Sequence, residues 1–426
     1  MNEFHYPKEE QERALLVGIE RPDATWSLES SLEELRRLAE TAGAEVVATT
    51  TQRLEKVNPK TFVGSGKAEE ISETCRLLGI DLVILDDELT PSQQSNLEKA
   101  VGRDVKVIDR TALILDIFAL HATTKEGRLQ VRLAQNEYLY PRLRGMWAHL
   151  ASNRMGGGVG SRFGEGESQL EVDRRIVRDR ITSIRRQLKE LDKNRAIQRQ
   201  KRQESGVFRV ALAGYTNAGK SSLLNLLTDA GVLSYDKLFA TLDSKSKRLI
   251  LPDGREVTLT DTVGFIQKLP TKLVESFKST LDEIREADLV LHIVDAADTD
   301  FEKQAKTVDE ILNQIEAGDI RRIMVFNKID LLDDGLLASL RYRYPEALFI
   351  SAHDGSGIDE LLAYIQQAAA DTGYVFQVLV PYKRGDVTSL AHSKCHVISE
   401  EHTAEGTKMK VQVSAPYKAL FAKFAE

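Results

Sequence analysis

A glycine-rich stretch in the middle of the chain has the residue types and spacing that bind phosphate. It fits the pattern GxxxxGKS, follows the apolar stretch 208–213 and precedes an amphipathic helical pattern. Glycines at these spacings let backbone N–H groups turn inward around a phosphate, while the lysine supplies a cation and the serine a ligand for Mg²⁺. The residues expected to bind the phosphates of a nucleotide are Gly214, Tyr215, Thr216, Asn217, Ala218, Gly219, Lys220, Ser221 and Ser222.

A second motif, DxxG, follows the β-branched stretch 257–260. Asp261 is expected to hold Mg²⁺ through water, and the Gly264 amide is expected to contact the γ-phosphate. Between the two motifs, Thr241 is the best candidate for a further magnesium ligand; the alternative is a threonine that faces a sheet. The predicted metal site is therefore Ser221, Thr241 and Asp261, and the predicted catalytic residues are Lys220, Thr241 and Gly264.

Two more motifs select the base. Asn327, Lys328 and Asp330 form NKxD after one apolar stretch, and Ser351 and Ala352 follow another. A carboxylate at Asp330 accepts from N1 and N2 of guanine, donors that adenine lacks at those positions, and the Ala352 amide is expected to meet guanine O6. The sequence therefore predicts a guanine nucleotide, GTP or GDP, as the ligand.

The four motifs in this order predict one P-loop domain that spans 207–371. Two positions in it leave the hydrolysis step open. Phe265 follows DxxG where Ras-like domains have a glutamine that orients the attacking water, so we expect slow intrinsic turnover and water oriented by another group or by a partner. Asn217 suits either of two roles, binding K⁺ as an extra charge or stabilising the loop.

The first 122 residues alternate apolar stretches with amphipathic ones. Strands are predicted at 14–19, 45–48, 81–85 and 105–108, and helices at 31–42, 67–78, 92–101 and 111–121. This alternation predicts a parallel sheet covered by helices, in an N-terminal α/β domain that spans 1–122. The string Gly64-Ser65-Gly66-Lys67 suits a helix cap better than a second phosphate site, because it is not GxxxxGKS.

Residues 123–203 form a basic segment of a chain that is acidic overall. The formal charge of the chain is −7, yet 125–203 holds 19 Lys and Arg against 9 Asp and Glu. Heptad spacing predicts two long helices paired as an antiparallel hairpin, with Pro141 kinking the first and a glycine-rich tip loop at 154–166. Such a hairpin suits RNA, a solvated charged face being the alternative. The candidate RNA contacts are Arg154, Gly156, Gly157, Gly158, Arg162, Arg174, Arg175 and Arg178.

A polar linker is expected at 200–206, and a small α+β domain at 373–426. That domain is predicted to contain strands at 374–379, 396–399 and 408–413 and helices at 386–393 and 416–424. The two cysteines, Cys75 and Cys395, lie far apart, which argues against a disulfide framework or a zinc site and favours the reducing cytoplasm. No apolar stretch is long enough to span a membrane, and the N-terminus lacks a signal-peptide pattern.

Beyond these motifs, the sequence resembles the HflX family within the Obg–HflX group of GTPases. The family-like strings lie at 62–71, 89–94, 109–118, 126–131 and 166–175, and together with the glycine-rich loop and the nucleotide motifs they cover nearly the whole chain. The sequence departs from the family at Ser244-Lys245-Ser246, where members usually have Pro-Thr. This departure concerns only the shape of the segment around Thr241.

The resemblance implies a Mg²⁺-dependent GTPase that binds the large ribosomal subunit and its rRNA, is stimulated by it, and separates stalled or heat-damaged ribosomes into subunits. Two alternatives stay open. One is a nucleotide-gated binding factor for ribosomes or RNA in which hydrolysis is incidental; the other is an ATP-dependent RNA-remodelling enzyme, because some family members take ATP in the N-terminal region. We expect a cytoplasmic monomer without an integral membrane segment, which is compatible with peripheral membrane association.

Overall fold

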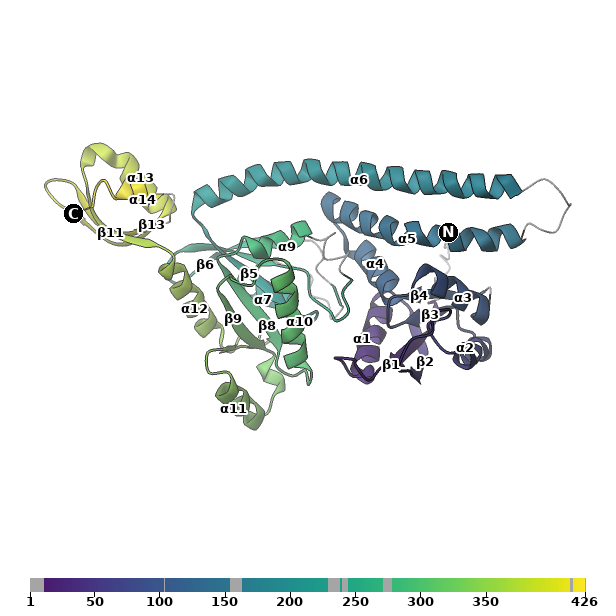
Figure 1. Ribbon diagram of the computed structural model, residues 1–426. Helices are drawn as coiled ribbons and strands as arrows, with labels where there is room; N and C mark the ends of the chain where they lie inside the picture. Colours follow the sequence, from purple (N-terminus) through teal and green to yellow (C-terminus); the bar gives the residue numbers. More distant parts are fainter. Residues whose placement is uncertain are drawn as a thin grey trace, which may run out of the picture. The chain divides into compact units, whose positions relative to one another are not determined.

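The computed structural model describes residues 11–102, 104–153, 163–228, 238–239, 244–270, 278–413 and 417–425. These residues fall into two compact units, whose elements are labelled in Figure 1. The first unit lies within Met1–Lys189, Asp236–Leu242 and Gln267–Phe277, and the second within Glu190–Tyr235, Asp243–Ile266 and Lys278–Glu426. Among the described residues, no helix is both long enough and apolar enough to cross a bilayer.

The first unit begins with a four-stranded parallel sheet in the order β2-β1-β3-β4. Its strands are β1 (Arg13–Glu20), β2 (Glu45–Arg53), β3 (Leu82–Leu85) and β4 (Lys106–Asp109), and the helices between and after them are α1 (Leu28–Thr41), α2 (Ser65–Leu78), α3 (Pro91–Val101) and α4 (Arg110–His121). The two central strands, β1 and β3, are buried almost throughout, as expected for a sheet with helices on both faces. The predicted N-terminal α/β arrangement is confirmed.

The string Gly64–Lys67, considered above as a second phosphate site, begins α2. Gly64 is the N-cap residue of this helix, and its N–H donates to Gln52 Oε1 at 2.9 Å. The Lys67 ammonium donates to Glu70 Oε1 (2.7 Å) and to Thr50 Oγ1 (3.2 Å). The contacts of Gly64 and Lys67 agree with the helix-cap interpretation.

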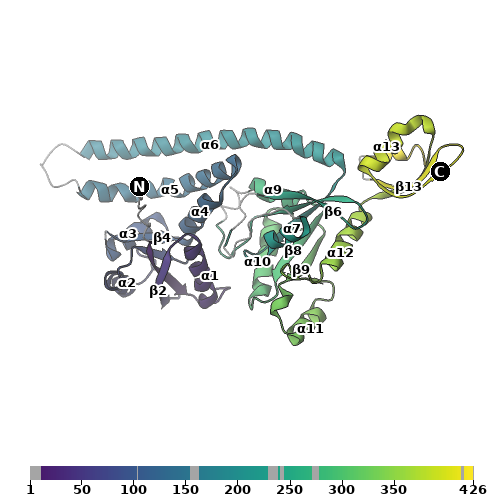
Figure 2. The same ribbon diagram turned by 180° about the vertical axis from the view of Figure 1, so that it is seen from behind.

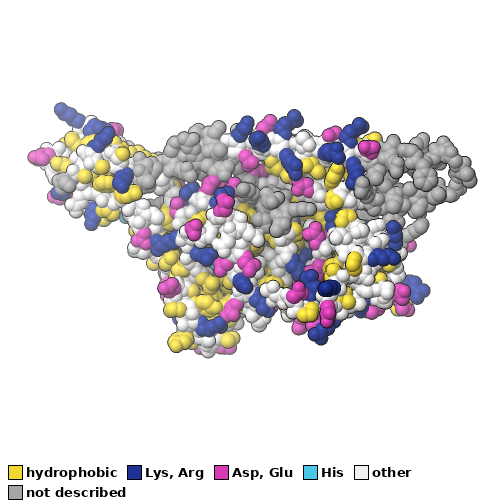
Figure 3. All heavy atoms as spheres, viewed as in Figure 1, with side chains coloured by type: hydrophobic (Ala, Val, Ile, Leu, Met, Phe, Trp, Pro, Cys, Tyr) yellow, Lys and Arg dark blue, Asp and Glu magenta, His cyan; other side chains and the backbone are white. Residues whose placement is uncertain are grey.

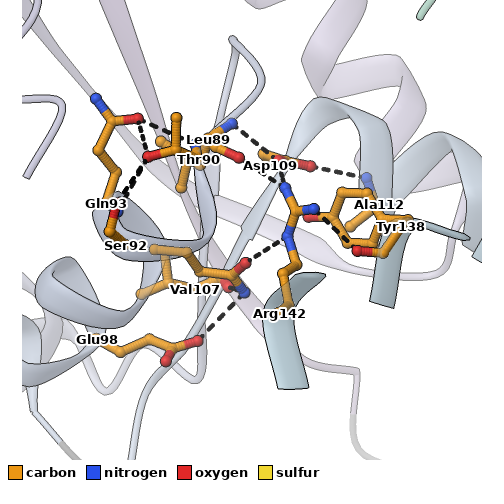
Figure 4. Close-up of polar contacts among 11 residues, drawn as sticks. Leu89, Thr90, Ser92, Gln93, Glu98, Val107, Asp109, Ala112, Tyr138 and Arg142 are labelled. Atoms are coloured by element: carbon orange, nitrogen blue, oxygen red, sulfur yellow. Dashed lines mark hydrogen bonds and ion pairs between the residues drawn. The ribbon is translucent and has the colours of Figure 1, made fainter. Parts of the chain in front are cut away.

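A buried arginine joins α5 (Lys125–Asn153) to the end of the sheet (Figure 4). Asp109, which ends β4 and is fully buried, accepts from Leu89 N at 2.9 Å and from Arg142 Nη2 at 3.2 Å. The same guanidinium donates to Leu89 O (2.6 Å) and Gln94 Oε1 (3.0 Å) and lies 3.4 Å from the centre of the Tyr138 ring. This network fixes the orientation of α5 because every group in it is directional.

The helices α5 and α6 (Phe163–Ser205) form the predicted antiparallel pair, side by side in Figures 1 and 2. Arg178 donates to the Tyr140 hydroxyl, and Arg185 donates to Glu137, both at 2.8 Å. The contacts show that the two helices run in opposite directions, since the later residue on α6 meets the earlier residue on α5.

Two details of this hairpin differ from expectation. The tip loop is shorter than predicted, because α6 begins at Phe163. The segment expected as a linker is helical, and α6 continues to Ser205; its many Arg, Gln and Lys residues are good helix formers. Pro141 lies inside the single helix α5, and the kink expected there stays a prediction.

The second unit contains a six-stranded sheet in the order β10-β9-β8-β5-β7-β6. Its strands are β5 (Phe208–Gly214), β6 (Lys245–Ile250), β7 (Glu256–Asp261), β8 (Leu289–Asp295), β9 (Arg322–Asn327) and β10 (Leu348–Phe349), and its helices are α7 (Lys220–Thr228), α9 (Lys278–Arg285), α10 (Phe301–Gln314), α11 (Asp334–Arg343) and α12 (Ile358–Asp371). All neighbours are parallel except β6 and β7, which form an antiparallel hairpin at the edge.

The last part of the chain forms a three-stranded antiparallel sheet in the order β11-β13-β12. Its elements are β11 (Tyr374–Val380), α13 (Gly385–Lys394), β12 (His396–His402), β13 (Thr407–Val413) and α14 (Lys418–Phe421). Val378, Val411 and Phe421 are fully buried in one small core, so the sheet and its helices pack as expected of an α+β fold. The last helix is shorter than the predicted 416–424.

Two short segments that lie between the nucleotide motifs in the sequence belong to the first unit. Phe239 packs edge-to-face on Phe118 of α4, with the ring centroids 4.6 Å apart. Lys268 forms ion pairs with Asp86 and Asp87, which follow β3. Phe239 and Lys268 have φ angles of 58° and 53°, a backbone region that bulky residues rarely adopt. No motif in the sequence indicated these contacts.

Candidate nucleotide-binding site

The four nucleotide motifs lie at the carboxyl ends of parallel strands in the second unit. β5 leads into the glycine-rich loop, β7 ends at Asp261, β9 ends at Asn327, and Ser351 follows β10 closely. These ends share one edge of the sheet, which is where ligands bind in open parallel sheets. The structure therefore brings together motifs that are far apart in the sequence.

Two glycines of the loop are required by close approaches. A Cβ atom on Gly214 would lie 2.3 Å from the backbone oxygen of Ile293 in β8. Gly219 has a φ of +93°, and a Cβ atom there would lie 2.1 Å from Asn327 Nδ2. After it, α7 begins with a hydrogen bond from Leu223 N to Gly219 O (2.9 Å). The loop thus ends at a helix N-terminus, a favourable place for phosphate.

Lys220 lies inside the loop rather than in solvent. Its side chain is 6% exposed, and its ammonium donates to Gly214 O (3.1 Å) and Tyr215 O (2.7 Å). Burial lowers the pKa of Lys220 to about 8, although the negative charge of Asp261 opposes the shift. A phosphate would add further negative charge next to the Lys220 ammonium, so the position of Lys220 suits its predicted role in binding the phosphates.

Two of the predicted metal ligands lie together. Ser221 Oγ donates to Asp261 Oδ2 at 2.6 Å, and Asp261 is fully buried. A hydroxyl and a carboxylate at this separation form the oxygen-rich donor set that Mg²⁺ prefers, so the residues fit the ion. Thr241, the third predicted ligand, lies outside the described residues. Ser222 follows on α7 and is partly buried.

Asn327 connects the base motif to the phosphate loop. Its amide nitrogen donates to Ala218 O (2.8 Å), and its side-chain oxygen accepts from Ala352 N (2.9 Å). Asn327 is 1% exposed, so these two bonds hold the loop and the segment after β10 in a fixed relation. The Ala352 amide, which was expected to meet guanine, donates to Asn327 in this structure.

Asp330 and Ser351 form the other half of the predicted base site. Ser351 Oγ donates to Asp330 Oδ1 at 2.7 Å and accepts from the backbone N–H groups of His353 and Asp354, both at 3.2 Å. Because one carboxylate oxygen is held in this way, the side chain is oriented before a base arrives. The arrangement fits the predicted role of Asp330 in the recognition of guanine.

Sequence reasoning missed Asp295, at the end of β8. Its Oδ2 lies 2.7 Å from the ammonium of Lys328, whose backbone has a φ of +65°. This ion pair orients the lysine of NKxD. An acidic residue that ends a buried strand next to the phosphate loop is a signal that could have identified it.

Phe265, expected to be unable to orient water, has a structural role. It is 1% exposed, its N–H donates to Gly214 O (3.1 Å), and its carbonyl accepts from Thr216 N (2.8 Å). These bonds tie the DxxG motif to the phosphate loop. Asn217 adopts a φ of +61°, a conformation that asparagine tolerates well. This conformation is compatible with the loop-stabilising role, and K⁺ binding stays the alternative.

The described RNA candidates lie on α6, where Lys and Arg side chains gather on the face seen in Figure 3. Arg175 and Arg178 are exposed, whereas Arg174 is partly buried and its guanidinium lies 5.6 Å from the centre of the Tyr140 ring. Arg178 also donates to the Tyr140 hydroxyl. The other candidates, Arg154, Gly156, Gly157, Gly158 and Arg162, lie outside the described residues.

Comparisons with known proteins agree with these observations. Three family models match consecutive parts of the chain: "GTP-binding GTPase N-terminal" at 29–119, "GTP-binding GTPase Middle Region" at 121–202 and "50S ribosome-binding GTPase" at 209–328. The proteins named "GTPase HflX" from Caldanaerobacter subterraneus subsp. tengcongensis and Escherichia coli K12 are 46% and 41% identical to it. The alignments cover 97% and 90% of this chain and 94% and 89% of those proteins. The chain belongs to the HflX family of GTPases.

Proposed function

We propose that this GTPase binds the large ribosomal subunit in its GTP state, separates stalled or stress-damaged ribosomes into subunits, and leaves after hydrolysis. The match of residues 209–328 to a family described as a 50S ribosome-binding GTPase carries the proposal. The basic hairpin supports it, since phosphate contacts supply most of the affinity for RNA.

The described residues suggest how each group acts on GTP. Bound Mg²⁺ would neutralise charge on the β- and γ-phosphates, held by Ser221 and Asp261, and by Thr241 as proposed above. Lys220 would exchange its bonds to the loop carbonyls for bonds to phosphate, while the Gly264 amide would donate to the γ-phosphate. Asp330 would accept from the guanine edge, oriented by Ser351.

A second candidate is a binding factor that GTP merely switches, with hydrolysis of little consequence. The buried Phe265 side chain cannot orient a water molecule, so slow intrinsic turnover is expected for this candidate as well as for the first. The rate of GTP hydrolysis with and without purified large subunits distinguishes the two. We expect clear stimulation by large subunits; an unchanged rate would reject the ribosome-activated enzyme.

Separation of ribosomes is measured by light scattering or sucrose gradients with intact ribosomes. We expect separation with GTP and with a non-hydrolysable analogue but not with GDP. The reason is that binding and separation require the γ-phosphate to be present, whereas its hydrolysis is required only for release. The analogue should leave the protein bound to the large subunit. Equal separation with GDP would contradict the nucleotide dependence.

The variant Asp330→Asn tests whether guanine recognition drives this activity. The new amide would present a donor to the guanine N1 and N2 donors, so we expect GTP affinity to fall roughly 100-fold. Xanthine carries an oxygen at C2 that can accept from this amide, so XTP should restore ribosome separation. ATP-dependent RNA unwinding that survives in this variant would instead favour the remodelling alternative.

A further inference from the structure

The phosphate loop contains a buried hydroxyl with no partner among the described residues. Thr216 is 8% exposed, and its Oγ1 atom makes no hydrogen bond within this part of the chain. Two other buried threonines at the site are paired: Thr262 donates to Leu212 O (2.7 Å), and Thr260 contacts Ser246 Oγ (2.9 Å). Because buried polar groups are nearly always bonded, the Thr216 hydroxyl needs an explanation.

The surroundings of Thr216 place it where the terminal phosphate is expected. A Cβ atom on Gly264 would lie 2.9 Å from Thr216 Cα and Cγ2 and 3.0 Å from Lys220 Nζ. The backbone and the methyl group of Thr216, the Lys220 ammonium and Gly264 therefore meet at one point, and the Thr216 hydroxyl, which is on the same Cβ atom as the methyl group, reaches that point by rotation about χ1. Lys220 and Gly264 are the groups predicted to contact the γ-phosphate. The backbone of Thr216 is held there by its bond to Phe265 O (2.8 Å).

This site also lacks the usual side chain for hydrolysis after DxxG, since Phe265 has no hydrogen-bonding group. No described residue bonds to the Thr216 hydroxyl, so its rotation toward this point breaks no hydrogen bond within the described part of the chain. We propose that Thr216 is a further catalytic residue, whose hydroxyl donates a hydrogen bond to the γ-phosphoryl group as it is transferred. This inference rests on the GTPase activity and deepens it.

The chemical step balances without a proton from Thr216. A water oxygen bonds to the γ-phosphorus, the bond to the bridging oxygen breaks, and GDP keeps that electron pair. The proton of the water passes to the released phosphate. Thr216 acts only as a donor, so its hydrogen bond stabilises negative charge on the γ-phosphoryl oxygens during transfer.

The test compares Thr216→Val, which removes the hydroxyl at constant shape, with Thr216→Ser, which keeps it. Single-turnover GTP hydrolysis should fall about 100-fold in the valine variant, as for the loss of one oxyanion donor, and stay within a few-fold in the serine variant. GDP affinity should change less than about twofold in both, because the contact is made to the γ-phosphoryl group. Thr307→Val on α10 is the matched control and should hydrolyse GTP normally.

Three results would overturn the inference. The valine variant could hydrolyse GTP at the wild-type rate; the serine variant could be as slow as the valine variant; or GDP affinity could fall together with the rate, which would indicate a role in loop structure. Should the valine variant not fold, Thr216→Ala gives the same comparison with less bulk. A wild-type protein that hydrolyses no GTP even with large subunits would reject the GTPase proposal itself.

Discussion

At the scale of single residues, the charge of Lys220 depends on where its side chain lies. Burial in the phosphate loop lowers its pKa to about 8, from the ordinary lysine value of 10.5. The folded protein therefore binds fewer protons than the unfolded chain between these two values. The free-energy cost of burying the protonated Lys220 amine is fully present below pH 8, and the stability of the fold increases as the pH rises from 8 to 10.5. A bound phosphate reverses the shift, because it favours the protonated amine.

Nucleotide binding should therefore take up protons at alkaline pH. With a free pKa near 8, we expect an uptake of roughly 0.7 proton at pH 8.5 and close to none at pH 7. Calorimetry of GDP binding in two buffers with different ionisation enthalpies measures this directly. Lys220→Arg, whose guanidinium stays charged, is the matched control. No uptake by the wild-type protein at pH 8.5 would show that Lys220 is protonated before the nucleotide binds.

At the scale of elements, the attachment of α5 to the N-terminal sheet depends on one buried ion pair. Asp109 is fully buried and Arg142 is 9% exposed, so neither charge is stabilised by water. Burial, followed by the charge of Asp109, raises the pKa of Tyr138, which keeps this hydroxyl neutral beside the pair. Removal of one partner would leave the other charged and unpaired.

We expect Arg142→Met to destabilise the N-terminal unit by about 3–5 kcal/mol, the cost of an uncompensated buried charge. Urea denaturation followed by hydrogen exchange of α4 and α5 measures the loss. Arg185→Met is the matched control on the same hairpin, because its pair with Glu137 is exposed and should contribute little. Equal stability of the two variants would mean that the α5 attachment does not depend on the Asp109 pair.

At the scale of the whole molecule, the chain has one segment with a net positive charge, and the rest of the chain is acidic. Residues 125–203 hold 19 basic and 9 acidic residues, whereas the rest of the chain holds 39 basic and 56 acidic ones. This uneven distribution of charge favours binding of the basic segment to a polyanion, while the acidic remainder of the chain repels the polyanion. The described part of α6 presents exposed arginines, among them Arg175 and Arg178.

Replacement of these two arginines should weaken binding to the large subunit in a salt-dependent way. For Arg175→Gln with Arg178→Gln, we expect the slope of log affinity against log salt to fall by about 1–2, one unit or less for each lost phosphate contact. Binding is measured between 50 and 200 mM KCl. GTP affinity should not change, and Lys306→Gln on α10 should leave the slope intact. An unchanged slope would place the RNA-binding surface elsewhere.

The sequence alone predicted the ligand class and the kind of most elements. The glycine spacing before Lys220, the DxxG and NKxD motifs and the carboxylate of Asp330 each identify a local chemistry. The periodicity of apolar residues likewise predicted the strands and helices of the N-terminal part, the hairpin and the C-terminal part, because strand and helix repeats are properties of consecutive residues. The strand β8 and the helices α9 to α12 were not predicted. The predicted boundaries were wrong where the sequence has weak helix start and stop signals, as at the two ends of α6.

Only the tertiary structure decided which distant residues meet. Asp295 pairs with Lys328 and Arg142 with Asp109, and Thr216 lies against Gly264, across strands whose order and register no local pattern specifies. The same holds for the burial of the Thr216 hydroxyl and for its lack of a partner among the described residues, since burial results from packing by several elements at once. Short segments of the sequence therefore indicate local chemistry, whereas charge balance and the pairing of hydrogen-bonding groups depend on how the segments pack.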